Sequence, residues 1–375
     1  MLWNRNFSLL VTATVLFHAA VYMLFPSLHQ WMMAKWGFTD LQSTYTTVLF
    51  GLSLFLLGAF NSYLMDTFSR KRICIWSILL FAVLILVCPY LTAGWQVVAL
   101  RIVQGSLCGI ALMATGSTLA IDVTPSHRRD GANRAFAHAS MIGMLAGFIL
   151  GKEGGMSYGA EVVFHASAVF CLVSALLVAW VKVCFRAPLD LPLCSSDRFL
   201  LPRALPPGIN MMTVPMVLGM LVISVSDVRI YLSIGAGFLL CVLLRQAIKF
   251  QVSGTLRILA GQLLMMGGLW LLYGEDALLA ENLLGGGLVG LGVGISIGHF
   301  LQLMILLPRH CERGTSYHTY RLLWETGLVL GILAGRYLLT GGVSPFVYEL
   351  LLCVTSVSAY VFYTHLYFKN HYQQL

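Results

Sequence analysis

The sequence predicts an all-α polytopic membrane protein: twelve transmembrane helices in two pseudo-symmetric six-helix bundles. Hydrophobic residues make up 58% of the chain and charged residues 10%, with a mean hydropathy of +0.83. In soluble domains about a quarter of the residues are charged. The apolar residues form continuous runs near the roughly 20 residues that cross a bilayer, without the alternation of a membrane barrel. Helices are then the elements that pair every backbone amide in lipid.

We expect the twelve spans at residues 8–28, 43–64, 73–92, 95–121, 134–152, 162–184, 209–226, 229–246, 257–274, 283–307, 319–340 and 345–368. Only Asp227 and Arg229 separate the seventh and eighth spans, so a count of ten or eleven is the alternative. The uncharged run from Asn6 to Ala34 is too long for the apolar core of a secretory signal, so we interpret it as a retained first span.

A proline-rich polar break near the chain midpoint predicts the domain organisation. It divides an N-terminal bundle (1–186) and a cytoplasmic linker (187–208) from a C-terminal bundle (209–375). A repeat supports the division: an arginine followed by three glycines four residues apart occurs twice, with an offset of 184 residues. Its members are Arg129, Gly143, Gly147 and Gly151, then Arg313, Gly327, Gly331 and Gly335. Such glycines equally suit close helix packing, and duplicated bundles with a site at their interface are a recurrent transporter design.

The positive charge predicts orientation rather than a nucleic-acid partner. The net charge is +8, but most bases fall in the loops of one side, and only Lys35, Lys152 and Arg229 fall in loops of the other. This bias predicts a multi-pass protein of the cytoplasmic (inner) membrane with both termini in the cytoplasm. The nine cysteines are scattered and no nucleotide-binding or metalloenzyme motif occurs, so we expect no metal, no cofactor and no catalytic residues.

A short charged hinge joins the second and third spans, where one acid precedes three bases. Leu64, Asp66, Arg70 and Lys71 resemble the loop motif G-x-L-A-D-R-x-G-R-K of the major facilitator superfamily, with serines at two of its glycine positions. Three further stretches resemble motifs of that superfamily. They are Arg101-x-x-Gln104-Gly105 in the fourth span, Asp122-x-x-Pro125-x-x-Arg128-Arg129 after it, and the ladder Gly143, Gly147, Gly151 in the fifth, where Phe148 replaces the proline of the antiporter motif.

This resemblance implies a secondary active transporter that moves a small solute by alternating access of the two bundles. It further implies proton coupling and, through the altered antiporter motif, efflux. We expect the protein to act as a monomer in the bilayer. The alternatives are a membrane-embedded enzyme, such as a lipid or sugar transferase, and a non-transporting sensor of the same fold.

The candidate cavity residues follow from the same resemblance, in which the first, fourth, seventh and tenth helices line the cavity. They are Arg101, Gln104, His18, Tyr22, Asn210, His299 and Gln302. The expected coupling group is Glu325 in the eleventh span or His18, because these two titratable residues lie deepest in the predicted spans. The expected gating residues are Asp66, Arg70, Lys71, Arg128, Arg129 and Arg313. We expect Asp66 to contact the start of helix eleven and Arg128 or Arg129. The alternatives are that Arg101 extends to the membrane surface and that His18 is a hydrogen-bonded core residue.

Overall fold

The computed structural model describes residues 2–183, 192–196, 198–247, 253–274, 278–309 and 312–372. The described elements are α1 (Arg5–Trp36), α2 (Asp40–Ser53), η1 (Gly58–Phe60), α3 (Asn61–Thr67), α4 (Arg70–Val87), η2 (Cys88–Tyr90), α5 (Gly94–Leu112), η3 (Met113–Leu119), α6 (Ala120–Val123), η4 (Ser126–Arg128), α7 (Arg129–Tyr158), α8 (Ala160–Trp180), η5 (Pro202–Ala204), α9 (Leu205–Met211), α10 (Thr213–Ser224), α11 (Val228–Ala247), α12 (Gly254–Leu272), α13 (Leu279–Leu306), α14 (Arg313–Thr340), α15 (Phe346–Ala359), η6 (Tyr360–Thr364) and α16 (His365–Tyr372).

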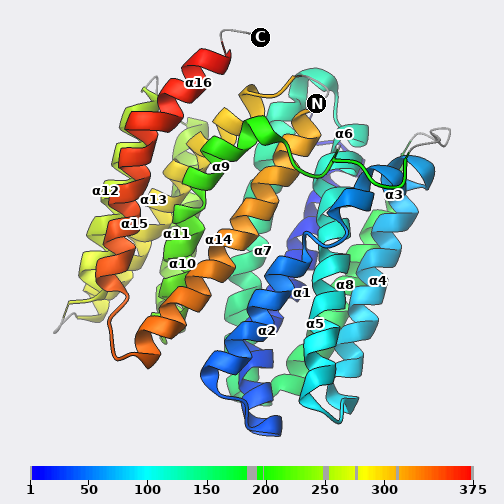
Figure 1. The fold of residues 1–375 in the computed structure, drawn as a ribbon, viewed down its shortest axis with the longest axis horizontal. Helices are drawn as coiled ribbons and strands as arrows, with labels where there is room; N and C mark the ends of the chain where they lie inside the picture. The colour runs from blue at the N-terminus through cyan, green and yellow to red at the C-terminus, as the bar shows by residue number, and fades with distance from the viewer. Residues whose placement is uncertain are drawn as a thin grey trace. The chain divides into compact units, whose positions relative to one another are not determined.

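The predicted fold class is confirmed (Figure 1). Within the described ranges, twelve helical stretches are long and apolar enough to cross a membrane. The seventh and eighth predicted spans are separate helices, because α10 ends at Ser224 and α11 begins at Val228. Tyr231 ties the turn between them by donating its hydroxyl to the Val225 carbonyl at 2.6 Å. The counts of ten and eleven are therefore wrong.

Several helices extend beyond the predicted spans, among them the first and the seventh. The first runs from Arg5 to Trp36 through Pro26, and it is capped by the Asn4 side chain and ended by Gly37 in the left-handed conformation. The seventh begins at Pro202, inside the expected linker, with prolines in the first turn of α9. Proline fits there because the first amides of a helix have no partner within the helix.

The chain divides into two compact units. Unit 1 comprises Met1–Leu201 and His310–Leu322, and unit 2 comprises Pro202–Arg309 and Leu323–Leu375. The division falls within α14, so the first turns of this helix belong to unit 1. Unit 1 also includes the described linker residues before Pro202.

Each unit contains one glycine ladder at a helix contact. In unit 1, a Cβ atom added at Gly143, Gly147 or Gly151 of α7 would collide with the backbone of α1. In unit 2, a Cβ atom at Gly327, Gly331 or Gly335 of α14 would meet the backbone of Met212, just before α10, or of Met216 and Met220 within α10. The repeated glycines thus allow the same close approach of two helices in each unit.

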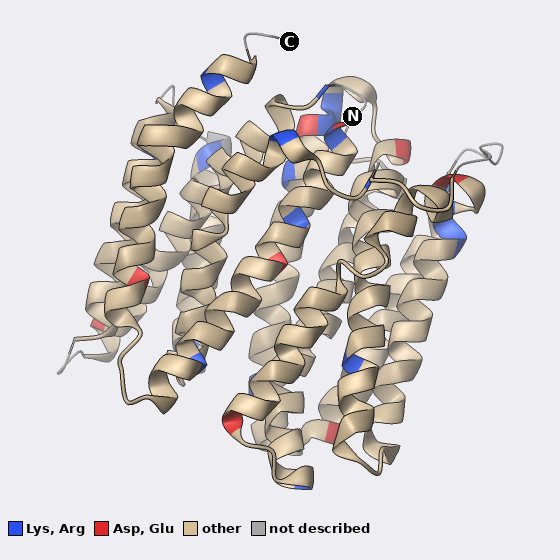
Figure 2. Ribbon diagram, in the orientation of Figure 1, with Lys and Arg blue, Asp and Glu red and all other residues tan. Residues whose placement is uncertain are grey.

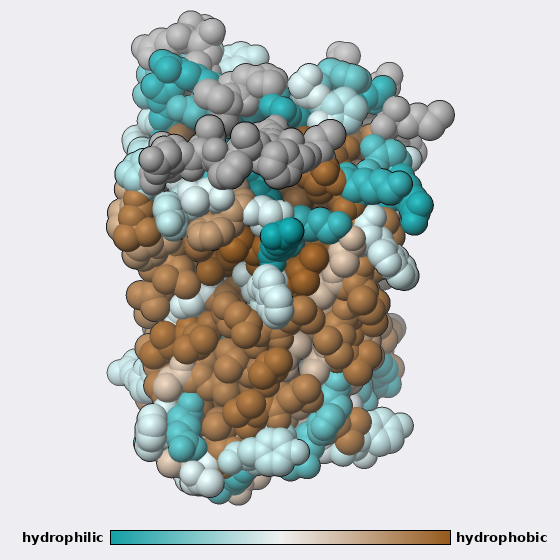
Figure 3. Space-filling view, turned by 90° about the vertical axis from the view of Figure 1, so that its right-hand side faces the viewer, coloured by the Kyte–Doolittle hydropathy of each residue, from teal (hydrophilic) through white to brown (hydrophobic). Residues whose placement is uncertain are grey.

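The outer surfaces suit a bilayer. On the face shown in Figure 3, hydrophobic side chains fill a broad band between hydrophilic ends. Several large apolar residues of α4 and α8 are exposed, including Trp76, Val83, Val169 and Leu176. Charged residues lie mainly near helix ends, and few lie in the middle of a helix (Figure 2). These few positions are the first candidates for function, because a charge inside a membrane is costly.

Candidate functional site

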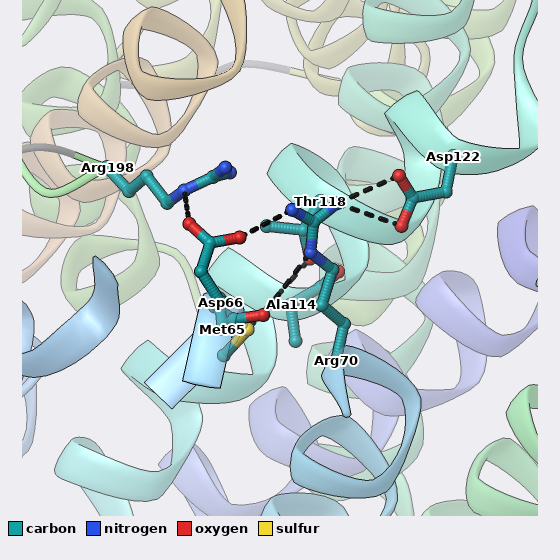
Figure 4. Close-up of polar contacts among 7 residues, drawn as sticks. All are labelled: Met65, Asp66, Arg70, Ala114, Thr118, Asp122 and Arg198. Atoms are coloured by element: carbon teal, nitrogen blue, oxygen red, sulfur yellow. Dashed lines mark hydrogen bonds and ion pairs between the residues drawn. The ribbon is translucent and has the colours of Figure 1, made fainter. Parts of the chain in front are cut away.

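The charged hinge forms a network in unit 1 that joins three helices. Arg70 donates from Nη2 to Asp66 at 2.6 Å and from Nη1 to both carboxylate oxygens of Asp122 at 2.8 and 3.0 Å (Figure 4). Helix α3 ends at Thr67 and α4 begins at Arg70, so only two residues separate the helices that carry Asp66 and Arg70. Both carboxylates and the guanidinium are nearly buried. Their ion pairs are therefore screened less by solvent than surface pairs.

The expected partners of Asp66 are wrong. Its other carboxylate oxygen accepts from Arg198 Nε at 2.7 Å, and its contacts in the described part of the chain do not include Arg128, Arg129 or the start of α14. The reason is local, since Arg70 lies only four residues away across the hinge. We call Asp66, Arg70, Asp122 and Arg198 the hinge network.

The other predicted gating bases lie near helix ends. Lys71 donates to the carbonyl of Val181 at 2.9 Å, where it can offset the partial negative charge at the end of α8. Arg313, the first residue of α14, pairs with Asp130 in the first turn of α7 at 3.3 Å. Arg128 is exposed and Arg129 half-buried.

Arg101 is held inside unit 1. It is only 1% exposed, so the alternative that it extends to the membrane surface is wrong. Its Nη1 donates to Gln104 at 3.0 Å, and its guanidinium carbon lies 4.2 Å from the ring centre of Phe50 and 5.7 Å from that of Phe25. No contact of Arg101 within the described ranges is with a carboxylate. Cation–π contacts and one neutral amide thus hold a buried positive charge.

A polar stripe on α1 connects Arg101 with a second buried base. Tyr22 stacks on Phe25 with ring centres 4.9 Å apart, and His18 lies one turn earlier. The Nδ1 of His18 lies 2.7 Å from the carbonyl oxygen of Thr14, and its Nε2 lies 2.9 Å from Nη2 of Arg321. A carbonyl can only accept and a guanidinium can only donate. His18 is therefore a neutral imidazole with its proton on Nδ1.

Arg321 lies near the start of the predicted eleventh span, and the sequence analysis does not select it as a site residue. It lies within α14 and is 3% exposed. His318, one turn earlier, is also buried, and its Nε2 lies 3.5 Å from Nδ2 of Asn61. Glu325 follows Arg321 by four residues on the same helix and is 4% exposed. This spacing, a base and an acid one turn apart inside a predicted span, was the sequence signal that could have identified Arg321.

Comparison with known proteins identifies the family. The model of the Major Facilitator Superfamily matches residues 10–364. The chain belongs to this superfamily. A crystal structure of the human organic anion transporter MFSD10 (TETRAN) superposes with a TM-score of 0.69 at 15% identity, covering 95% of this chain and 98% of the other. The POT family transporter PepTSo superposes with a TM-score of 0.71 at 10% identity, covering 100% and 99%. No curated protein matches the sequence.

Membership of the superfamily confirms the resemblance drawn from the hinge and the arginine motif. The transporter is a multi-pass membrane protein with twelve helical spans in its described residues. The structural likenesses, at 15% identity and below, show the fold alone.

In unit 2 of the transporter, the predicted cavity residues contact other side chains of that unit. Asn210 donates to Thr364 at 3.0 Å and accepts from Ser356 at 3.0 Å. His299 lies 2.7 Å from the Tyr360 hydroxyl. Gln302 accepts from Arg257 at 3.3 Å. These contacts join α9 to α15 and η6, and α13 to η6 and α12, within the unit.

The sequence interpretation missed one buried acid. Glu349 in the first turn of α15 has no exposed surface, and it accepts from the Tyr273 hydroxyl at 3.2 Å. Burial and the neighbouring Glu349 carboxyl raise the pKa of Tyr273, which lies just beyond the end of α12. Glu349 is the only acid in the last predicted span, and that isolation was the available signal.

Proposed function

We propose that this transporter is a proton-coupled secondary transporter that exports a small solute with an anionic group across the cytoplasmic membrane. Alternating access of the two predicted bundles would carry the solute, with both termini in the cytoplasm and the monomer as the working unit. Family membership supports transport rather than enzymatic activity. The observation that carries the solute class is the buried guanidinium of Arg101.

Arg101 supports an anionic solute because its charge has no acidic partner among the described residues. A guanidinium inside a membrane costs about 2.5 to more than 10 kcal/mol without compensation. Phe50 and Gln104 supply part of that compensation. An anion with a planar carboxylate or phosphate would supply the rest, through paired hydrogen bonds to the guanidinium. The human structure of the same fold is named an organic anion transporter, in agreement with this class.

His18 and Arg321 support proton coupling. The Nε2 of His18 can accept from Arg321 only while the imidazole is neutral, so a proton that binds Nε2 must break this contact. Two cations would then stand face to face, and their repulsion would favour a rearrangement of α14. Imidazole suits such a switch because it titrates near neutral pH in water. Glu325, one turn further along α14, is the second coupling candidate.

The export direction rests on the glycine ladder of α7, whose spacing resembles the antiporter motif. Phe148, which is buried, stands at the position of the motif's proline. Because phenylalanine keeps the backbone amide that proline lacks, α7 continues through this position as a regular helix. Flux measured in both directions tests export directly.

Purified transporter in proteoliposomes tests the proposal. Anionic, neutral and cationic solutes of similar size are loaded or added outside, with and without an imposed pH gradient, and their flux is followed in both directions. We expect flux of anionic solutes, and we expect this flux to rise when the imposed proton gradient is directed opposite to the movement of the solute. Flux of neutral or cationic solutes alone would overturn the solute class, and flux indifferent to the gradient would overturn coupling. Folded protein that binds an anionic solute without moving it would favour a sensor.

A further inference from the structure

The segment that precedes unit 2 packs against the second span between the end of α2 and the start of α3, where the span is not a regular α-helix. The last described residues of this segment, Ser195, Ser196 and 198–201, all belong to unit 1. We call these residues the strap. The strap meets the second span where α2 has ended and the chain passes through turns and η1 before α3.

Besides the Arg198–Asp66 ion pair, contacts around η1 hold the strap in place. The amide of Ser195 donates to the carbonyl of Ala59 at 2.9 Å. The ring of Phe199 covers Gly58, where an added Cβ atom would collide with it, and it meets Phe55 edge-on with ring centres 6.2 Å apart.

At its far end the strap is anchored by Leu201. The amide of Leu201 donates to the Thr319 hydroxyl at 2.9 Å, and the Leu201 side chain is buried. Because unit 2 begins at Pro202, no residue separates Leu201, the last residue of the strap, from the first residue of unit 2. Any movement of that residue away from Thr319 must pull on the strap.

Arg198 is the centre of the strap. Its φ of 60° lies in the left-handed region, which is strained for a residue with a side chain. The same residue places Nε 2.7 Å from the Asp66 carboxylate, on the oxygen that Arg70 does not use (Figure 4). Two arginines thus fix both oxygens of one buried carboxylate. The strain is held by the contacts on either side of Arg198.

We propose that the strap is a conformational lock on the hinge network, with Arg198 as the positioning residue that holds Asp66 toward Arg70. While the strap is seated, Asp66 cannot exchange partners and the chain entering unit 2 is tied to Thr319. Release of the strap frees both at once, and transport requires this release. The docking of the strap is independent of the proposed function, whereas the requirement of its release for transport rests on the proposed function.

Hydrogen–deuterium exchange of the purified transporter tests the docking. Arg198→Gln removes the charge, and the matched control is Arg203→Gln, which changes an exposed arginine a few residues further along. We expect exchange of the strap amides to rise about tenfold in Arg198→Gln, the equivalent of about 1.4 kcal/mol, and to stay at the wild-type rate in the control. Phe199→Ala, which removes the aromatic ring that covers Gly58, should have the same effect. Wild-type exchange in both strap variants would overturn the lock.

A reversible cross-link tests whether release is needed for transport. Ala59→Cys and Ser195→Cys are combined in a background without the nine natural cysteines. The backbone hydrogen bond between these residues brings them close to the spacing that a disulfide bridges. We expect oxidation to lower flux about tenfold or more and reductant to restore it, while oxidation of either single-cysteine variant changes nothing. Flux within twofold of the reduced protein would overturn the requirement for release.

The two experiments separate the lock from the proposed function. If no solute is moved by wild-type protein, the proposed function has failed, and the exchange measurement still decides whether Arg198 seats the strap. If wild-type protein moves a solute and the cross-linked protein moves it equally well, the proposed function stands and the lock falls.

Discussion

His18 and Arg321, 303 residues apart in the sequence, lie 2.9 Å from each other inside unit 1. The contact joins α1 to the first turns of α14, which pack with unit 1 although the rest of α14 belongs to unit 2. A proton on His18 and a hydrogen bond from Arg321 exclude each other at Nε2. A proton on Nε2 of His18 would therefore break a contact with α14, the helix within which the division between the two units falls.

Replacement of His18 by glutamine separates coupling from packing. The glutamine amide oxygen can accept from Arg321, but the amide takes up no proton near neutral pH. We expect His18→Gln to bind solute with near wild-type affinity and to lose about tenfold or more of its gradient-driven flux in proteoliposomes. His165→Gln, on an exposed histidine of α8, should behave as wild type. Full gradient-driven flux in His18→Gln would make His18 a core residue and leave Glu325→Gln as the next variant to measure.

Arg101 should not tolerate lysine. An ammonium cannot reproduce the planar fork of the guanidinium or its stacking on Phe50. We expect Arg101→Lys and Arg101→Ala each to lower anionic solute flux about tenfold or more, with expression near wild type. Arg229→Lys is the matched control, since Arg229 is largely exposed and pairs with Asp227. A fully active Arg101→Lys variant would remove Arg101 from the solute site.

The glycines of the transporter differ in what surrounds them, and thermal unfolding in detergent can measure the difference. At Gly147 an added methyl group would collide with the backbone of Ala19 on α1, whereas at Gly267 in α12 it would meet nothing within 4 Å. We expect Gly147→Ala to destabilise by about 1–3 kcal/mol, because α1 and α7 must separate. Gly267→Ala should stabilise by about 0.5–1 kcal/mol, because alanine favours the helix. Equal effects of the two substitutions would contradict the packing role of the ladder.

Asn210 should affect stability more than solute binding. Its side chain bridges Ser356 and Thr364, both of which are buried. Asn210→Ala leaves both hydroxyls without this partner, and we expect a loss of about 1–3 kcal/mol in unfolding free energy. Thr355→Ala, on the exposed side of α15, is the control and should stay near wild type. Unchanged stability with weaker solute binding would instead return Asn210 to the cavity lining that the sequence predicts.

The sequence was sufficient for those features that depend on local composition. Continuous apolar runs fixed the twelve spans, because lipid leaves the backbone few ways to pair its amides. The hinge motif and Arg101-x-x-Gln104 identified the superfamily, and their spacing predicted that Arg101 and Gln104 share a face, as they do. The repeated glycines predicted that two helix pairs approach closely, and in the structure a Cβ atom added at Gly147 or Gly331 would collide with the backbone of a neighbouring helix.

Contacts between distant segments could be decided only by the tertiary structure. Arg70 lies only four residues from Asp66, but the second partner of Asp66, Arg198, is 132 residues away and is brought to it only by the folded chain. Arg321 lies near the start of the predicted eleventh span, and only the folded chain shows that it is buried there beside His18. A charged residue looks the same in a sequence whether its side chain lies in water or against a buried partner. The difference in solvation energy between those places is set by neighbours that only the folded chain brings together.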